Sequence, residues 1–408
     1  MRIAVVGGGI LGSIVALFAA ARGWEVEVLD SRPEILSAAS CANEGKVHLG
    51  PIFALGDAET REVMLRGALS FASLVEDALG AGVDWGEMSS APFDYIVMPT
   101  SLLDAPALAQ RYSAMNARFE QLSKHVGSHY LGGTIDHLVD PEPRTDESTG
   151  FPMFATAERA VDPIVLCRLV SARIASATNI AVRASHRVIS LDPAPTGVDV
   201  SWRVPGGSAK SGKYDFVVNC AWENQLALDS DPDQGGRNFR VKTAVRLRGV
   251  AGTRTVTLAQ GPFGDVVSHR DYTYASWYPE ARLTNEFGTE PSDHARTLLE
   301  RITAADGEDA DLAGWRTSIA LRQLAALREL GLLPDFGGPV ELVGGVIVGH
   351  GSRDIDDHGS RLHSRAEFGT RTAGRLLSPR NFKLTTAPLA ARHAIESIDA
   401  VLNPTVLA

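Results

Sequence analysis

Residues 5–12 read Val-Val-Gly-Gly-Gly-Ile-Leu-Gly, and Gly7, Gly9 and Gly12 match the pattern G-x-G-x-x-G. In this pattern the first glycine permits a tight turn, the second lets a pyrophosphate approach the backbone, and the third lets helix and strand pack closely. The helix that follows directs unpaired N–H groups and the positive end of its dipole toward the phosphates. The stretch therefore predicts a dinucleotide-binding βαβ unit.

The sequence around this motif fits the same unit. Residues 2–6 predict a buried parallel strand, residues 10–22 a helix and residues 25–29 a second strand. Asp30 follows Gly12 by 18 positions, close to the roughly 20 expected of an acid that binds a ribose 2′-hydroxyl. Because an acid here repels a 2′-phosphate, the spacing favours FAD or NAD over NADP. The alternative interpretation is a glycine turn in an ordinary βαβ unit.

Composition limits the class of protein. The chain has 408 residues, 44% hydrophobic and 22% charged, which suits one large or two ordinary globular domains. A formal net charge of −10 argues against nucleic acid or an anionic membrane as the main partner. No run of about 18 apolar residues predicts a transmembrane helix. The three cysteines suggest neither a disulfide framework nor a metal site, and they fit a reducing, cytoplasmic compartment.

The rest of the chain alternates between helical and strand patterns. Helices are predicted over residues 58–79, 105–126, 163–177, 321–330 and 387–402. Strands are predicted over residues 180–191, 198–204, 214–219, 242–250 and 340–348. The expected fold is α/β, with a discontinuous Rossmann-like domain over residues 1–88, 150–235 and 345–408. Residues 89–149 and 236–344 are expected to build a second α+β domain on a mostly antiparallel sheet, a layout that argues against a simple NAD dehydrogenase.

The chain resembles the D-amino-acid oxidase-like superfamily of FAD-dependent oxidoreductases, which includes glycine and sarcosine oxidases and D-amino-acid dehydrogenases. Besides the glycine motif with Asp30, the likeness is carried by residues 40–46 (SCANEGK), 160–163 (AVDP), 215–221 (DFVVNCA) and 383–388 (KLTTAP). The last stretch is also similar to glycerol-3-phosphate dehydrogenase and 2-hydroxyglutarate oxidoreductases. The resemblance implies FAD as the cofactor, a Rossmann-like FAD-binding domain and a separate substrate domain.

The resemblance also implies which residues contact FAD. For the pyrophosphate and the adenosine these are Gly7, Gly9, Gly12, Asp30, Arg32, Val188 and Ala221. The loop implied to run past the pyrophosphate toward the ring contributes Ser40, Asn43, Gly45 and Lys46. The pyrimidine edge of the flavin is implied to face Lys383, Leu384 and Thr385.

Two residues are candidates for the chemistry itself. Hydride transfer to flavin N5 leaves negative charge at N1 and the C2 carbonyl, which Lys383 before the last helix is suited to stabilise. His48, at the end of the cofactor loop, is suited to accept a proton from a substrate amine or alcohol. The alternatives are a solvated lysine and a structural histidine. Cys41 is either a covalent anchor for the flavin or, more simply, a small packed residue.

Candidates for substrate binding lie further along the chain. The segment Gly351-Ser352-Arg353 resembles the family's glycine-x-arginine segment, whose arginine binds a carboxylate through paired donors. An ion pair between Arg353 and one of the acids that follow it is the alternative. Arg246 and Arg248, two apart on one predicted strand, are second candidates. A substrate pocket or, alternatively, core packing is expected of Tyr272, Tyr274, Trp277 and Tyr278.

Together these patterns predict an FAD-dependent oxidoreductase. It is expected to oxidise a C–N bond of an amino acid or secondary amine, or a C–O bond of a 2-hydroxy acid, by hydride transfer to flavin N5. The electrons then pass to oxygen or another acceptor. A flavin-dependent monooxygenase is the first alternative, although no second nucleotide-binding glycine motif is found. A non-catalytic FAD-binding protein is the other.

Overall fold

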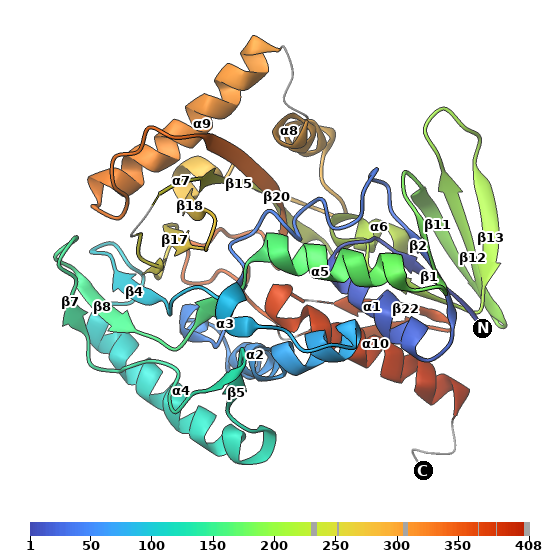
Figure 1. The fold of residues 1–408 in the computed structure, drawn as a ribbon, viewed down its shortest axis with the longest axis horizontal. Coiled ribbons are helices and arrows are strands. Elements are labelled where there is room, and N and C mark those ends of the chain that lie inside the picture. Colours follow the sequence, from blue (N-terminus) through green and yellow to red (C-terminus); the bar gives the residue numbers. More distant parts are fainter. Residues whose placement is uncertain (230–234, 251–252, 305–308, 366, 381, 404–408) are drawn as a thin grey trace.

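Two large sheets organise the computed structural model, which describes all residues except 230–234, 251–252, 305–308, 366, 381 and 404–408 (Figure 1). The first sheet has six strands, in the order β10 (Ile180–Arg183), β2 (Glu25–Leu29), β1 (Arg2–Val6), β14 (Phe216–Asn219), β22 (Leu376–Arg380) and β21 (Gly369–Ala373). Pairing is parallel from β10 to β22, and β21 adds to the edge antiparallel. This is the arrangement expected of a Rossmann-like domain.

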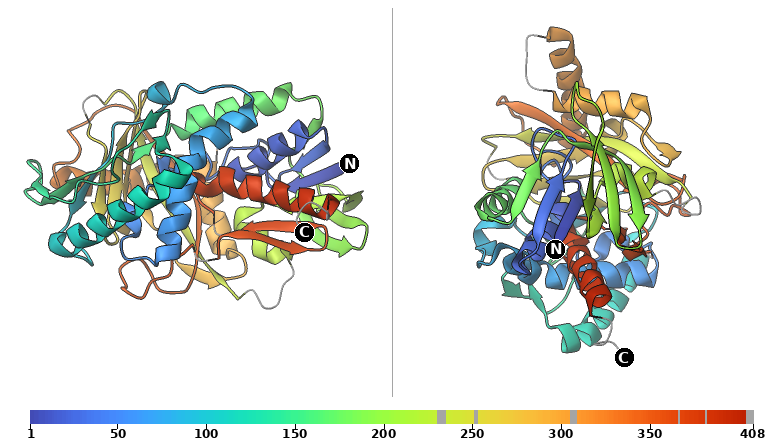
Figure 2. Two further views of the ribbon diagram at one scale, coloured as in Figure 1. Left: turned by 90° about the horizontal axis from the view of Figure 1, so that it is seen from below. Right: turned by 90° about the vertical axis from the view of Figure 1, so that its right-hand side faces the viewer.

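The first sheet is buried on both faces, which explains the continuous apolar run of β1. Ile3 and Val5 pack in the cluster that includes the helices, whereas Ala4 and Val6 pack on the opposite side. The helices of the first face are α1 (Ile10–Ala21), α2 (Ala58–Leu79), α5 (Pro163–Ser176) and α10 (Ala387–Leu402). The other face carries a three-stranded antiparallel sheet of β11 (Arg187–Ala194), β12 (Gly197–Arg203) and β13 (Lys210–Tyr214). In the left view of Figure 2 the red helix α10 runs beside the blue helix α1.

The second sheet is mostly antiparallel. Its strands are β19 (Glu286–Gly288), β15 (Arg237–Leu247), β18 (Thr273–Trp277), β17 (Gly264–Ser268), β16 (Val256–Ala259), β4 (Asp94–Val97), β8 (Pro152–Ala155) and β7 (Arg144–Thr145), with β20 (Val340–Gly349) paired along β15. Only the pair of β16 and β4 is parallel among these described strands. The helices α8 (Asp293–Thr303) and α9 (Ala310–Glu329) pack on this sheet, and α4 (Ala105–Val126) lies toward its β7–β8 edge (Figure 1).

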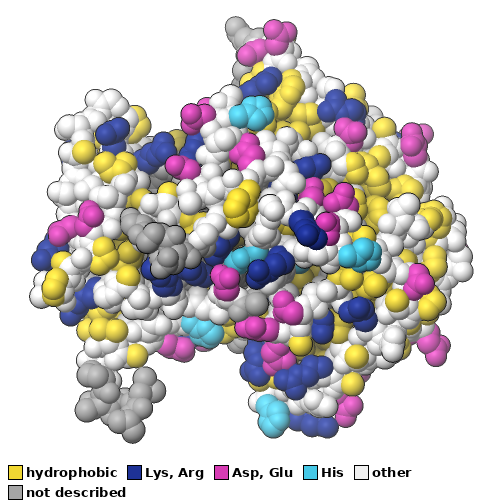
Figure 3. Space-filling model, turned by 180° about the vertical axis from the view of Figure 1, so that it is seen from behind, with side chains coloured by type: hydrophobic (Ala, Val, Ile, Leu, Met, Phe, Trp, Pro, Cys, Tyr) yellow, Lys and Arg dark blue, Asp and Glu magenta, His cyan; other side chains and the backbone are white. Residues whose placement is uncertain are grey.

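Short elements lie between these strands and helices. They are β3 (Lys46–Val47), α3 (Trp85–Met88), β5 (His129–Tyr130), β6 (Gly133–Thr134), β9 (Arg159–Ala160), α6 (Gln225–Asp229), α7 (Tyr278–Ala281) and 3₁₀ turns at Pro51–Phe53, Trp222–Asn224 and Leu384–Thr386. In the described part of the chain, no helix combines the length and apolar character needed to cross a bilayer. Basic and acidic side chains are interspersed over the face shown in Figure 3.

Most predicted elements form, with two informative differences. The helices over 58–79, 105–126 and 387–402 have the predicted bounds. The strand predicted over 180–191 is two strands, because Ser185 adopts a positive φ of 57° where the chain leaves the parallel sheet for the antiparallel one. The helix predicted over 321–330 begins at residue 310, where the side chain of Asp309 accepts a hydrogen bond from the Leu312 N–H.

The strands of the two sheets interleave along the sequence, as a discontinuous domain requires. The predicted boundaries at 88, 150, 235 and 345 stay a prediction. Two strands near these boundaries, β8 at 152–155 and β20 at 340–349, belong to the second sheet. Of these two strands, β20 lines the cleft described below.

Candidate active-site cleft

A cleft of about 1360 Å³ lies between the two sheets. Its floor includes Val6, Leu29 and Cys220, at the carboxyl ends of β1, β2 and β14. This is the edge of a doubly wound sheet at which nucleotides bind. The volume exceeds the roughly 300–1,000 Å³ of a pocket for one small molecule. The cleft therefore has room for a dinucleotide together with a substrate.

The glycine motif forms one end of the cleft. Gly7 has a φ of +95°, and a Cβ added to it would lie 2.6 Å from the carbonyl oxygen of Cys220. A Cβ on Gly12 would lie 1.9 Å from the carbonyl oxygen of Gly7, so this glycine packs α1 onto the turn and does not line the cleft. Gly9 lines the cleft and begins α1 without a side-chain cap. The open first turn of α1 fits a pyrophosphate.

Asp30 and Ser40 hold the glycine turn in shape. The Asp30 carboxylate accepts the Gly8 N–H at 2.6 Å and the Arg32 N–H at 2.8 Å. Ser40 Oγ accepts the Ile10 N–H at 2.9 Å in the first turn of α1. Asp30, Arg32 and Ser40 all line the cleft, and their contacts with the adenosine and the phosphates stay a prediction. Val188 on β11 and Ala221 after β14 also line it.

The loop after Ser40 is shaped by Asn43 and Gly45. The Asn43 amide donates to the carbonyl oxygens of Ala39 and Ser40 and accepts the Gly45 N–H at 2.7 Å. A Cβ on Gly45 would lie 1.8 Å from the carbonyl oxygen of Val161, so only glycine fits. Asn43 lines the cleft, whereas Gly45 packs behind it. The open helix end and this shaped loop fit FAD, with Gly45 acting through the loop.

The inner end of the cleft, away from the glycine motif, begins at Lys46. Its buried Nζ lies 2.7 Å from Asp265 Oδ1, donates to Thr257 Oγ1 and sits 4.2 Å from the centre of the Phe93 ring. Burial disfavours the charge, but the carboxylates of Asp265, Glu158 and Glu44 together outweigh it and raise the pKa of Lys46 above its ordinary value. Lys46 lines the cleft, yet its charge is compensated by the protein itself.

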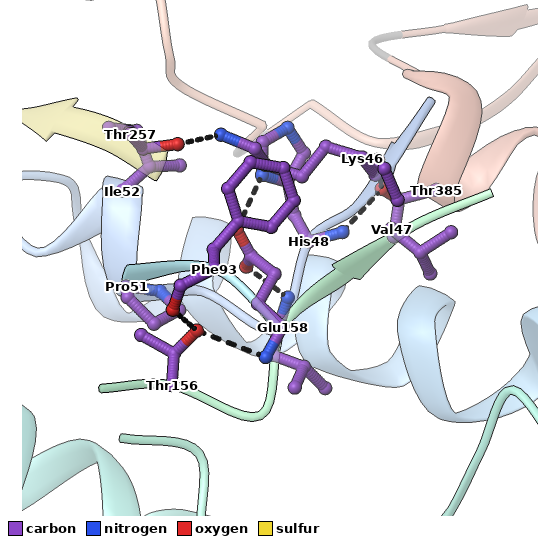
Figure 4. A network of polar contacts seen from close by, with 12 residues as sticks. Lys46, Val47, His48, Pro51, Ile52, Phe93, Thr156, Glu158, Thr257 and Thr385 are labelled. Carbon is purple, nitrogen blue, oxygen red and sulfur yellow. Dashed lines mark hydrogen bonds and ion pairs between the residues drawn. The ribbon is translucent and has the colours of Figure 1, made fainter. Parts of the chain in front are cut away.

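His48 lies next to Lys46 and also lines the cleft (Figure 4). Its backbone N–H donates to Thr385 Oγ1 at 2.9 Å, and its ring meets the edge of Phe53 at 5.2 Å between centroids. Its Nδ1 lies 3.5 Å from the fully buried Glu158 carboxylate. Burial lowers the pKa of His48, against the opposing effect of Glu158, so the imidazole is neutral at pH 7. A neutral imidazole is able to accept a proton.

Lys383 faces the same space from the start of the last helix. It lines the cleft together with Leu384, while Thr385 lies behind them and supports His48. The Lys383 Nζ lies 5.8 Å from the centre of the Phe53 ring. Burial, reinforced by the positive charge of Arg365, lowers the pKa of Lys383 to about 7.

Two arginines that the sequence reasoning missed complete the inner end. Arg240 on β15 is 4% exposed; it donates to the Tyr278 hydroxyl at 2.9 Å and lies 3.8 Å from Asp354. Arg365 is 2% exposed and donates to the Ser364 carbonyl oxygen at 2.6 Å. Burial and the charge of Arg240 lower the pKa of Arg365 to about 10. Within the described part of the chain, no carboxylate forms an ion pair with Arg365.

Arg353 lies elsewhere, which corrects the prediction that it faces the substrate. Its side chain is 65% exposed and pairs with Asp357 at 3.4 Å, and it does not line the cleft. Arg246, the second candidate, is buried but donates to the Cys41 carbonyl oxygen and pairs with Glu341 at 3.3 Å. Arg248 is exposed. Arg353 follows the end of β20 at Gly349 in an exposed segment, so its guanidinium is in contact with solvent.

Of the four predicted aromatic residues two line the cleft, whereas the other two and Cys41 pack against other parts of the protein. Tyr274 and Tyr278 line the cleft, whereas Tyr272 packs against the Arg246 guanidinium and Trp277 against the core of the second sheet. The Cys41 thiol donates to the Ala38 carbonyl oxygen at 3.4 Å and does not line the cleft, and burial raises its pKa. In the part of the chain that is described, no three His, Cys, Asp or Glu residues are placed to hold a metal ion.

The comparison of the sequence with protein families gives one assignment. The family described as FAD dependent oxidoreductase matches residues 2–396. The match therefore spans both sheets and the cleft between them. None of the curated proteins matches the sequence.

Several solved structures share the fold over the whole chain. Iminodiacetate oxidase from Chelativorans sp. BNC1 is 16% identical with a TM-score of 0.62, and the alignment covers 98% of this chain and 95% of that one. Glycine oxidase from Geobacillus kaustophilus is 15% identical with a TM-score of 0.61 and the same coverages. The L-alpha-glycerophosphate oxidase of Mycoplasma pneumoniae, solved with FAD bound, is 13% identical with a TM-score of 0.56 and coverages of 98% and 94%. At these identities the likeness shows the fold.

Proposed function

The chain belongs to the family of FAD dependent oxidoreductases and uses FAD as its cofactor, and we propose that it oxidises a small carboxylate-bearing amine or amino acid at a C–N bond. The observation that carries the proposal is Arg365, a buried guanidinium without a carboxylate partner among the described residues, next to Arg240 in the cleft. Since burying an unpaired charge is costly, such a group is retained to bind an anionic ligand. Two neighbours in fold, named iminodiacetate oxidase and glycine oxidase, support a substrate of this class.

Arg365 and Arg240 bind and orient the substrate carboxylate in this proposal. A guanidinium presents paired N–H donors that match the two oxygens of a carboxylate. Tyr278 and Asp354 already contact Arg240. Arg365 is therefore the main positive charge available to bind the substrate carboxylate. The bond to be oxidised is then presented to FAD, which when bound supplies the acceptor for a hydride at its N5 position.

His48 and Lys383 handle charge and protons. The neutral His48 imidazole accepts a proton from the substrate nitrogen, so that the lone pair needed for C–N oxidation becomes available. Lys383 supplies positive charge where negative charge develops at the pyrimidine edge of the cofactor. Its lowered pKa makes that charge sensitive to pH near neutrality.

Oxidation of a C–O bond in a 2-hydroxy acid is the second candidate. It is favoured by the His48–Glu158 pair, because an alcohol needs a stronger proton acceptor than an amine does. It is also consistent with the neighbour named L-alpha-glycerophosphate oxidase, which acts on an anionic molecule. Oxygen or another small molecule is proposed as the electron acceptor, in a cytoplasmic setting.

An anaerobic screen of the purified holoenzyme tests both candidates. Amino acids, N-substituted glycines and 2-hydroxy acids are added in turn, and reduction is followed as loss of the flavin's visible absorbance. Bleaching by an amine but not by the matching hydroxy acid supports the first candidate, and the reverse supports the second. Bleaching by NADPH alone would instead point to a monooxygenase. If none of these compounds reduces the flavin, the proposal is wrong.

A further inference from the structure

Glu158 is a carboxylate that lies behind His48, outside the lining of the cleft, and has no exposed surface. Its Oε2 accepts the Leu49 N–H at 2.7 Å, and its Oε1 accepts the Tyr95 hydroxyl. The same Oε1 lies 3.5 Å from His48 Nδ1 (Figure 4). A carboxylate buried this deeply is expensive unless it is paired. Its position therefore calls for an explanation that core packing alone does not give.

The backbone brings Glu158 and His48 together. Strands β3 and β9 pair antiparallel, with Lys46 opposite Ala160 and Val47 opposite Arg159. One more step along this register places His48 opposite Glu158. Cross-strand neighbours on the same face have Cβ atoms about 5 Å apart, which puts a carboxylate within reach of an imidazole. The contact is thus fixed by the ladder and by the Glu158 bond to the Leu49 N–H.

The Nδ1 atom of His48 faces Glu158. Nδ1 is buried and has no hydrogen-bond partner in the described structure, and the Glu158 carboxylate at 3.5 Å is the acid that faces it. The ring packs against Phe53 in an edge-to-face arrangement, and Thr385 Oγ1 holds the backbone of His48. The remaining nitrogen, Nε2, is then the one left to act as an acceptor.

We propose that Glu158 is the positioning residue that holds His48 in the Nδ1–H tautomer and stabilises its imidazolium when Nε2 takes a proton from the substrate. This rests on the proposed function of His48. The bond that breaks is N–H of the substrate ammonium or O–H of an alcohol, and the bond that forms is Nε2–H. The positive charge gained by His48 is balanced by the negative charge of Glu158, so the site as a whole does not bury a new net charge.

The charges around the pair fit this role. Burial tends to raise the pKa of Glu158, but His48, Lys46 and Tyr95 outweigh it and lower that pKa, so the carboxylate stays ionised. Around His48, burial, Lys383 and Lys46 lower its pKa, and Glu158 is the group that raises it. His363, across the Phe53 ring, is half-buried, and desolvation and nearby cations hold its pKa well below the usual value, so it adds no charge at pH 7.

Glu158→Gln tests the proposal, because glutamine keeps the size and the acceptor for Leu49 while removing the charge. We expect the rate of flavin reduction at pH 7 to fall roughly tenfold or more, toward the size of a lost acid–base contribution. The substrate KM should change little, since the arginines are untouched. Without the anion the His48 pKa falls further, so the acid limb of the pH–rate profile should move to lower pH.

Tyr95→Phe is the matched control. It removes the hydroxyl that donates to Glu158 and leaves the Glu158–His48 pair in place. We expect a small change in rate and no shift of the acid limb toward lower pH. Equal losses in Glu158→Gln and Tyr95→Phe, with unshifted pH profiles, would mean that Glu158 serves packing only and would overturn the proposal.

A measurement on the FAD-loaded wild type keeps the test independent of turnover. The ¹⁵N signals of the His48 ring, assigned by their loss in His48→Gln, report the tautomer and the pKa directly. We expect the Nδ1–H tautomer at pH 7. A dominant Nε2–H tautomer overturns the proposal even if Glu158→Gln does not fold. Because this readout needs no substrate, failure of the substrate screen and failure of the Glu158 assignment are distinguishable.

Discussion

At the nucleotide end of the cleft the groups offered to the cofactor are largely backbone N–H donors, whereas at the inner end they are buried charged side chains. The first end is built from Gly7, Gly9 and the open turn of α1, within a dozen residues of one another. The second end combines His48, Arg365 and Lys383, which come from three distant segments. Backbone donors require that side chains stay out of the way, but buried charges require specific partners.

This difference predicts how each end fails. The nucleotide end should be sensitive to added atoms and tolerant of lost polar groups, because several backbone donors share the phosphates. The inner end should be sensitive to the loss of single charged side chains, because no neighbouring group makes the same interaction with substrate or cofactor. Substitutions at the two ends, each with a matched control, test this contrast.

Gly12→Ala should give the largest effect. The new Cβ would lie 1.9 Å from the Gly7 carbonyl oxygen, so the turn or the helix must move. Overpacking of this kind costs ~3 kcal/mol, which corresponds to roughly 100-fold weaker FAD binding. The FAD content of the purified protein and the FAD dissociation constant measure it. Gly82→Ala is the control, because its Cβ meets nothing within 4 Å and FAD binding should be unchanged.

Arg365→Met should have the next largest effect, on substrate rather than cofactor. Methionine keeps an apolar side chain and removes the guanidinium, and a charged hydrogen bond contributes about 1.5–3 kcal/mol, or roughly 10- to 100-fold in KM. Arg353→Met, at an exposed arginine paired with Asp357, should leave KM unchanged. Steady-state kinetics with the best substrate of the screen decides. A large effect of Arg353→Met with none of Arg365→Met would restore the assignment made from the sequence.

The same contrast explains what the sequence reveals. The glycine motif and Asp30 form a local pattern whose geometry follows from spacing, and Gly7, Gly9 and Asp30 all line the cleft, while their contact with FAD stays a prediction. The helices over 58–79 and 105–126 were predictable because their apolar periodicity is long. These features need little knowledge of distant parts of the chain.

The inner end was harder to predict because its residues meet only through tertiary structure. Arg240 and Lys242 lie two apart on β15 and both line the cleft. The predicted strand began at residue 242 and so left Arg240 out. Arg365 follows no periodic element. The pairing of His48 with Glu158 depends on β3 and β9, two-residue strands too short to leave a period in the sequence.

Lys383→Met tests the inner end at the cofactor itself. Loss of a positive charge worth about 1.5–3 kcal/mol should lower the flavin midpoint potential by roughly 30–60 mV for a two-electron couple. Because burial lowers the pKa of Lys383 to about 7, its charge is present below pH 7 and lost above it. The difference between wild type and variant should therefore be largest below pH 7 and shrink as the pH rises.

Lys383→Arg is the control for that measurement. Arginine keeps its charge across this pH range, so its potential should stay close to the wild-type value at pH 6 and exceed it at pH 8. A potential that is equal in wild type and Lys383→Met at every pH would place the cation away from the flavin. Lys383 would then not be an example of a single buried charge that acts on the cofactor, and the contrast between the two ends would be weaker.

Ser40→Ala should give the smallest effect and is the sharpest test of tolerance at the nucleotide end. Ser40 Oγ accepts the Ile10 N–H at 2.9 Å, and its loss removes one neutral hydrogen bond, about 1 kcal/mol or roughly fivefold in FAD affinity. Ser73→Ala, on the exposed face of α2, is the control and should change nothing. If Ser40→Ala weakened FAD binding as much as Gly12→Ala does, phosphate binding would not be distributed over several backbone N–H donors. The nucleotide end would then depend on single side chains, just as the inner end does.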